Sequence, residues 1–201
     1  MPVRGVVFDV GNVIVRWDPR TLYSQIFPDV AERDWFLANV CTMPWHVAHD
    51  AGVRFADNRV ALIAQYPQHE AAIVAWGDRW WEMFSGPIPE TEAAIEAMAA
   101  RGVPMVGLTN MSTETSEGTF AMSLAFGRLK DIVVSADVGL MKPDPRIFRL
   151  AAERAGLPPA ELLFVDDSRT NIDAAASLGF DVHLFDDPAT LQPALAARGL
   201  L

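Results

Sequence analysis

Apolar and polar positions change rhythm along the chain, and the changes predict a sheet protein with one all-helical segment. Residues 3–10 are a β-branched apolar run that ends at a Gly-Asn turn, as a buried strand does. From residue 17 to about 84, apolar residues recur at three- to four-residue spacing, and Pro and Gly punctuate the pattern. This spacing predicts successive helices over 20–27, 30–40, 44–50, 54–66 and 68–84.

After the linker-like residues 86–89 (Gly-Pro-Ile-Pro), helical and strand patterns alternate to the end of the chain. The predicted strands are 103–109, 131–135, 161–165 and 180–185, and the predicted helices are 90–100, 112–124, 144–155, 169–178 and 188–198. Such alternation predicts a parallel sheet with helices on both faces. We therefore expect an α/β fold: a doubly wound parallel sheet with an inserted helical cap. The core would comprise 1–16 and 87–201, and the cap 17–86.

Composition narrows the possible partners and location. The 201 residues are 51% hydrophobic, enough for a substantial core, and carry a formal net charge of −10. This charge disfavours binding to nucleic acid or to an anionic membrane. The single cysteine, Cys41, excludes an internal disulfide, and the sequence has neither a signal-peptide pattern nor an apolar run long enough to span a membrane. We expect a soluble, cytoplasmic protein.

Polar residues suited to phosphate chemistry lie at or just beyond the ends of the predicted strands. Asp9 follows the first strand, Thr109 ends another, Lys142 lies beyond the 131–135 strand, and Asp166-Asp167 follow 161–165. The carboxyl ends of parallel strands meet at one edge of a sheet, where such folds place their active sites. Carboxylates can hold a divalent cation, and an aspartate can act as a nucleophile.

Each of these residues also has an ordinary structural interpretation. Asp9 could cap a turn, although it is the only charge between Gly5 and Val15. One acid of the 166–167 pair could cap the next helix, but adjacent carboxylates repel each other, and a shared cation would resolve that repulsion. Thr109 could be an ordinary helix cap, and Lys142 a solvated loop lysine. The motifs GxxxxGK[ST], GxGxxG, GxSxG and HExxH are absent from the sequence.

Four segments together resemble the motifs of the haloacid dehalogenase (HAD) superfamily. They are FDVGNVIV around Asp9, LTNMS around Thr109, VGLMKPDPRIF around Lys142 and FVDDSRTNIDAAASLG around Asp167. Their order and spacing fit, and the resemblance extends over essentially the whole chain. Within the superfamily, the chain is most similar to small capped phosphatases of the glucose-1-phosphate phosphatase kind. The resemblance implies a Rossmann-like core with a helical cap inserted after the first motif.

The resemblance also implies roles for the acids. Asp9 would attack phosphorus and form an aspartyl-phosphate. Mg²⁺ would be bound by Asp9, the backbone carbonyl of Gly11 and Asp167, with Asp166 as a ligand or as support for the other ligands.

The remaining motif residues would bind the substrate. By resemblance, Thr109, the amide of Asn110 and Lys142 would hold the transferring phosphoryl group, and water would then hydrolyse the intermediate. In-line phosphoryl transfer depends mainly on positioning and charge neutralisation, which these residue types supply.

Gly11 departs from the pattern, because typical HAD phosphatases have a second aspartate there as general acid and base. Losing a positioned proton donor typically costs about 10²–10⁴-fold in rate. Three alternatives follow. The substrate carries a good leaving group, such as an anomeric hydroxyl; a cap residue, His46, His49 or Asp50, supplies the proton; or the enzyme is slow and its true role is a different one. His46 and His49 share a helix face and could meet the site, and plain aromatic packing of the cap is the alternative.

The expected function is Mg²⁺-dependent hydrolysis of a small phosphomonoester, with sugar phosphates as the leading substrate class. A first alternative is a 2-haloacid dehalogenase-type hydrolase, in which Asp9 attacks carbon and no metal is needed. A second is a weakly active or non-catalytic binding protein with the same fold. The expected partner is a small-molecule phosphoester, with neither nucleic acid nor membrane, and the chain could be a monomer or a homodimer.

Overall fold

The computed structural model describes residues 2–201, which form a central five-stranded parallel sheet. The strand order is β5-β4-β1-β6-β7, and every neighbouring pair is parallel. The strands are β1 (Gly5–Phe8), β4 (Met105–Thr109), β5 (Asp131–Val134), β6 (Leu162–Asp166) and β7 (Asp181–Leu184). The expected parallel α/β sheet is confirmed, and β1, the first strand in sequence, lies at its centre.

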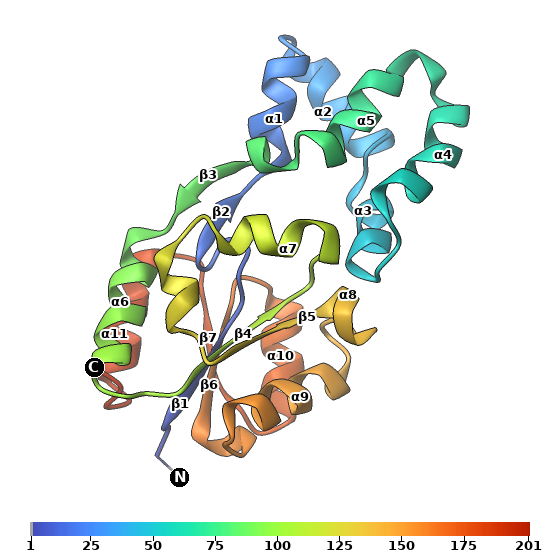
Figure 1. Cartoon of the computed structure of the whole chain (residues 1–201). Helices are drawn as coiled ribbons and strands as arrows, with labels where there is room; N and C mark the ends of the chain where they lie inside the picture. Colours follow the sequence, from blue (N-terminus) through green and yellow to red (C-terminus); the bar gives the residue numbers. More distant parts are fainter. Residues whose placement is uncertain (1) are drawn as a thin grey trace.

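Helices cover both faces of the sheet (Figure 1). The helices of one face are α6 (Pro89–Ala100) and α11 (Leu191–Ala196), and those of the other are α9 (Pro145–Ala155) and α10 (Arg169–Ser177). Side chains alternate between two cores, as strand geometry requires. Val6 and Phe8 of β1 belong to the core that includes residues of α6 and α11, and Val7 to the core that includes residues of α9 and α10.

An all-helical insert stands beyond the carboxyl edge of the sheet (Figure 1). It contains α1 (Pro19–Ile26), α2 (Val30–Asn39), α3 (Met43–Asp50), α4 (Phe55–Gln65) and α5 (Glu70–Asp78). The insert has its own aromatic core, in which Tyr23, Phe36 and Trp76 are essentially inaccessible to solvent. The helical insert is therefore confirmed as well.

Two short strands that the sequence pattern does not predict connect the insert to the sheet. β2 (Val15–Trp17) and β3 (Phe84–Pro87) form an antiparallel ribbon. In the predicted linker at 86–89, Gly86 and Pro87 thus belong to β3. Pro89 is the first residue of α6, a position at which proline is favoured. β2 has only three residues, and β3 contains Gly86 and Pro87, which are unusual inside strands, so neither gives a strand pattern in the sequence.

Several predicted helices are shorter or interrupted. The 112–124 helix ends earlier, as α7 (Thr113–Phe120), and a 3₁₀ segment follows at 124–128. The predicted 68–84 helix divides into α5 between two 3₁₀ turns. A short helix, α8 (Ser135–Val138), follows β5. Among residues 2–201, no helix is long and apolar enough to cross a membrane.

Candidate active site

The carboxyl ends of β1, β4 and β6 bring three predicted site residues to one edge of the sheet. Asp9 directly follows β1, and its N–H donates to the carbonyl oxygen of Val165 in β6 at 2.9 Å. Thr109 and Asp166 are the last residues of β4 and β6, and both are buried. Because β4 and β6 flank β1, the three residues lie around Asp9.

Lys142, from the loop between α8 and α9, lies among the acids. Its Nζ is 2.8 Å from Asp9 Oδ1 and 2.8 Å from Asp166 Oδ2. Burial disfavours the charged form of Lys142, but the two carboxylates outweigh burial and raise its pKa above the ordinary value. Lys142 is therefore a fixed, buried ammonium group.

Asn110 ties the end of β4 to the Lys142 loop. Its Nδ2 donates to the carbonyl oxygen of Lys142 at 3.0 Å, and its Oδ1 accepts from the Lys142 N–H at 2.8 Å. The sequence resemblance implies a role for the backbone amide of Asn110 only. The structure adds a second role, in which the side chain fixes the backbone of the buried lysine.

The two adjacent acids are in different environments. Asp166 is fully buried, and besides Lys142 it accepts from the N–H of Ser168 at 2.8 Å and from Asn171 Nδ2 at 3.1 Å. Asp167 is exposed. Asp166 therefore has ample hydrogen-bond and charge partners, whereas the Asp167 side chain is accessible for a ligand.

The three acids fit a divalent cation. One carboxylate oxygen from each of Asp9, Asp166 and Asp167 lies within 4.8 Å of the others. Burial raises the pKa of Asp9 to about 8, with Lys142 opposing the shift and Asp166 adding to it. Burial and mutual repulsion thus oppose ionisation of all three acids beside one ammonium, and a hard cation with oxygen ligands would supply the positive charge that favours their ionised forms.

A cavity of about 230 Å³ opens over the acids, between the edge of the sheet and the insert. Asp9, Thr109, Asn110, Lys142 and Asp167 line its polar end, together with Gly11 and Asn171. Its apolar walls come from Trp17, Met43, Trp80, Phe84 and Met111. A cavity of this size admits a small metabolite, with a charged end for an anionic group and an aromatic end for the remainder.

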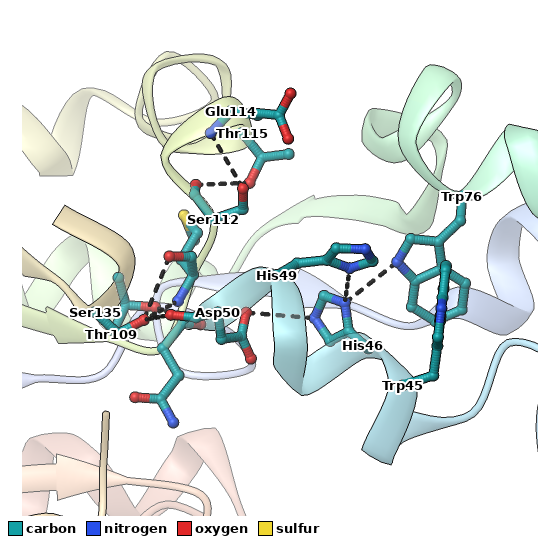
Figure 2. Close-up of polar contacts among 12 residues, drawn as sticks. Trp45, His46, His49, Asp50, Trp76, Thr109, Ser112, Glu114, Thr115 and Ser135 are labelled. Atoms are coloured by element: carbon teal, nitrogen blue, oxygen red, sulfur yellow. Dashed lines mark hydrogen bonds and ion pairs between the residues drawn. The ribbon is translucent and has the colours of Figure 1, made fainter. Parts of the chain in front are cut away.

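The α3 helix presents some of its polar residues to this cavity. His46 and Asp50 line it, whereas His49 is fully buried behind them, where its Nε2 is 2.9 Å from Asn58 Nδ2. Figure 2 shows Asp50 between His46 and the end of the sheet at Thr109 and Ser135. Burial lowers the pKa of His46 to about 3 and that of His49 to about 4, so both rings are neutral near pH 7.

Three supporting residues were not singled out by the sequence analysis. Asn12 adopts a left-handed conformation (φ 56°), and its Oδ1 accepts from the Trp17 N–H at 3.0 Å, which shapes the turn after Asp9. Asn171 holds Asp166, and the Ser135 hydroxyl donates to the carbonyl oxygen of Asp50 at 2.6 Å. The Gly-Asn pair is a sequence signal for the turn at Asn12. The roles of Asn171 and Ser135 depend on tertiary contacts, which the sequence does not reveal.

Similar proteins include both phosphatases and dehalogenases. The chain is 35% identical over 116 residues to the acyl-CoA dehydrogenase family member 10 of Mus musculus, which covers 58% of this chain and 11% of that protein. It is 32% identical over 104 residues to a phosphatase of Mycobacterium tuberculosis (51% and 48%) and 30% identical over 96 residues to an (S)-2-haloacid dehalogenase of Pseudomonas putida (48% and 42%). The chain thus spans about half or less of these relatives.

A solved structure with a similar fold is a HAD family enzyme of Bacteroides thetaiotaomicron in complex with magnesium. The two share 17% sequence identity at a TM-score of 0.70, over 96% of this chain and 99% of the other. At this identity the likeness concerns the fold. The sequence pattern of one hydrolase family matches residues 3–179. The chain therefore belongs to the haloacid dehalogenase-like hydrolases.

Proposed function

We propose that the protein is a magnesium-dependent phosphomonoester hydrolase that works through an aspartyl-phosphate on Asp9. The observation that carries this proposal is the cluster of three carboxylates around Asp9 beside one buried lysine. Such a cluster is suited to a divalent cation and a phosphoryl group, which together balance its charges. Structures of a HAD family enzyme of Bacteroides thetaiotaomicron contain magnesium and inorganic phosphate, which supports the same chemistry.

The proposed metal ligands are Asp9, the carbonyl oxygen of Gly11 and Asp167. Asp166 would support them, since it is already engaged by Lys142. When bound, Mg²⁺ would neutralise charge on the phosphoryl oxygens and keep the Asp9 carboxylate ionised.

The chain's own groups would position and attack the phosphoryl group. Within residues 2–201, the hydrogen bonds to the Asp9 carboxylate go to Oδ1, from the Val10 N–H at 2.7 Å and from Lys142, which leaves Oδ2 to attack phosphorus. Lys142, the Thr109 hydroxyl and the Asn110 N–H would hold the phosphoryl oxygens. Water would then attack phosphorus and release inorganic phosphate and the Asp9 carboxylate.

For the substrate we propose a small phosphomonoester with a ring-bearing group, sugar phosphates first. The aromatic end of the cavity supports this, because Trp17 and Trp80 offer flat apolar surface beside polar groups. His46 would contact this part of the substrate. We also propose the division that the sequence predicts, with core segments 1–16 and 87–201 and a substrate-selecting cap at 17–86.

A second candidate is a 2-haloacid dehalogenase, favoured by the 30% identity to the Pseudomonas putida enzyme. In that reaction Asp9 would attack carbon, which calls for no divalent cation. The clustered acids at 9, 166 and 167 would then keep an unbalanced negative charge. This charge is the reason for placing the phosphatase first.

The deciding experiment offers both substrate classes to the same protein. We expect phosphate release from a panel of sugar and other small phosphomonoesters with Mg²⁺, and no halide release from 2-chloropropionate with or without metal. Halide release without phosphate release would assign the dehalogenase. Neither activity in a folded protein would contradict both candidates and favour a non-catalytic role.

A further inference from the structure

Asp50 faces the active-site cavity from the helical insert. It is the last residue of α3, is 7% exposed, and lines the same cavity as Asp9 and Lys142. Its carbonyl oxygen accepts from the Ser135 hydroxyl at 2.6 Å, and Ser135 follows β5 directly. The end of α3 is therefore fixed to the edge of the sheet, and Figure 2 shows the carboxyl group of Asp50 directed toward the His46 ring.

The carboxyl group of Asp50 is buried without a hydrogen bond. Its Oδ1 is inaccessible and has no hydrogen-bond partner within residues 2–201, and His46 Nε2 approaches it only to 3.6 Å. A buried, unpaired carboxylate is costly, and protonation removes most of that cost. Burial accordingly raises the pKa of Asp50 to about 7, although the positive charge of Lys142 opposes the shift.

A chain of hydrogen bonds sets the orientation of His46 beside this carboxyl group. Asn58 Nδ2 donates to His49 Nε2 at 2.9 Å, so the hydrogen of His49 is on Nδ1, which lies 3.3 Å from His46 Nδ1. Trp76 Nε1 also donates to His46 Nδ1, at 3.2 Å. His46 therefore carries its hydrogen on Nε2, directed at Asp50 Oδ1. With Oδ1 covered by His46, Oδ2 is the oxygen that faces the cavity.

Other charged groups near Asp50 do not compete for its proton. His46, in the same helix, is neutral near pH 7. In α8, which packs against α3, the carboxylate of Asp137 accepts from the Thr113 hydroxyl at 2.5 Å. Lys142 is held by Asp9 and Asp166. The carboxyl group of Asp50 is thus partly protonated near pH 7 and can exchange its proton with the cavity.

The position two residues after Asp9 has no acid to perform this task. Gly11 carries no side chain, and a Cβ built there would meet no atom within 4 Å. The space beside the nucleophile is therefore open, and any protein group that donates a proton lies elsewhere on the cavity wall. Asp50 is the carboxyl group that the insert supplies to that wall.

We propose that Asp50 is the proton donor and acceptor of the reaction, an inference that rests on the proposed phosphatase function. As Asp9 forms its bond to phosphorus, the bond from phosphorus to the leaving-group oxygen breaks, and Asp50 Oδ2 gives its proton to that oxygen. In the second step, Asp50 takes a proton from water as the water oxygen bonds to phosphorus and the Asp9–phosphorus bond breaks. Each cycle converts one phosphomonoester and one water into an alcohol and phosphate.

Leaving-group dependence tests this role. We would measure kcat/KM of Asp50→Asn and the wild type, with Mg²⁺, on phenyl phosphates of increasing leaving-group acidity, up to p-nitrophenyl phosphate. We expect a loss of about 10²–10⁴-fold for phenyl phosphate, because its phenolate needs a proton, and a much smaller loss for p-nitrophenyl phosphate. Adding Gly11→Asp to Asp50→Asn should recover activity on phenyl phosphate, because the new acid fits beside Asp9.

Control variants distinguish a failure of the proposed Asp50 role from a failure of the proposed phosphatase function. Asp57→Asn, at an exposed position of the neighbouring helix α4, makes the same substitution away from the cavity and should leave both rates unchanged. Equal losses of Asp50→Asn on all esters, or no loss, in a variant with wild-type circular dichroism would overturn the role of Asp50. If the wild type hydrolyses none of the esters, or Asp9→Asn hydrolyses them equally well, the proposed function itself fails.

Discussion

The sequence alone leaves the surroundings of the Lys142 side chain open, and the fold defines them. In the sequence Lys142 is a loop lysine followed by Pro143 and Pro145, and in the fold it is buried with its Nζ 2.8 Å from two carboxylates. Buried ion pairs contribute little net stability, but removing one partner leaves the other charge uncompensated. Lys142 therefore matters for stability as well as for binding a phosphoryl group.

Lys142→Met tests this at the level of stability. Without metal, the variant should lose about 3–5 kcal/mol of unfolding free energy, because the fully buried carboxylate of Asp166 is left without its cation. Urea unfolding in EDTA measures the loss. Lys130→Met changes the chain's other lysine, whose Nζ makes only a 3.5 Å contact to a carbonyl oxygen, and should cost much less. Similar losses in both variants would contradict a special role for the buried lysine.

The raised pKa of Asp50 predicts a pH-dependent stability. Its pKa is about 7 in the folded protein and 3.8 in the unfolded chain, so the folded state binds more protons between these values. The contribution of Asp50 to the unfolding free energy is thus greatest below about pH 4 and falls by on the order of a few kcal/mol as the pH rises through 7. Asp50→Asn cannot titrate, so its stability relative to the wild type should rise from pH 5 to about pH 8. Urea unfolding from pH 5 to pH 8 measures the unfolding free energy of both proteins. A difference between them that stays constant over this range would contradict a raised pKa of Asp50.

At the scale of elements, the main strands and the polar residues at their ends are predictable from sequence. The apolar runs before Asp9, Thr109 and Asp166 end close to where β1, β4 and β6 end, because a buried strand leaves little room for polar groups. The β2–β3 ribbon is not predictable, since its short strands are stabilised mainly by each other. Nor is the orientation of α3, whose His46 faces the cavity and whose His49 does not, because that depends on tertiary packing.

The link between β4 and the Lys142 loop gives a prediction at this scale. Asn110→Ala removes both hydrogen bonds that hold the Lys142 backbone, so the ammonium group should lose its fixed position. We expect kcat to fall by about 10²-fold, as for other small misplacements of a catalytic group. Steady-state phosphate release measures the fall. Asn39→Ala, on an exposed part of α2, is the matched control, and an equal effect there would contradict the positioning role of Asn110.

At the scale of the whole molecule, cap and sheet form separate hydrophobic cores that meet at the cavity. The aromatic core of the insert contains Trp76 and Tyr23. The two cores on the faces of the sheet are separate from it and contain Phe8 and Val7, respectively. The acids lie at the sheet edge below this junction, so a bound cation would connect strand ends that are distant in sequence. A ligand that binds only the folded state stabilises the entire protein.

Magnesium should therefore raise the thermal unfolding temperature. A concentration of about 100 times Kd would add about 2.7 kcal/mol to the unfolding free energy. Asp167→Asn should remove most of this gain, because it lacks one proposed ligand. Asp173→Asn, at an exposed position of α10, should retain it. Differential scanning calorimetry with Mg²⁺ and with EDTA makes the comparison, and an equal gain in all three proteins would argue against the site.

The central claim is that Asp9 performs metal-dependent phosphoryl transfer. The most direct measurement is steady-state phosphate release from p-nitrophenyl phosphate by the wild type and Asp9→Asn, each with Mg²⁺ and with EDTA. We predict turnover by the wild type with Mg²⁺ only, and none by Asp9→Asn under either condition. Turnover that persists in EDTA or in Asp9→Asn, with both proteins folded, would contradict the claim.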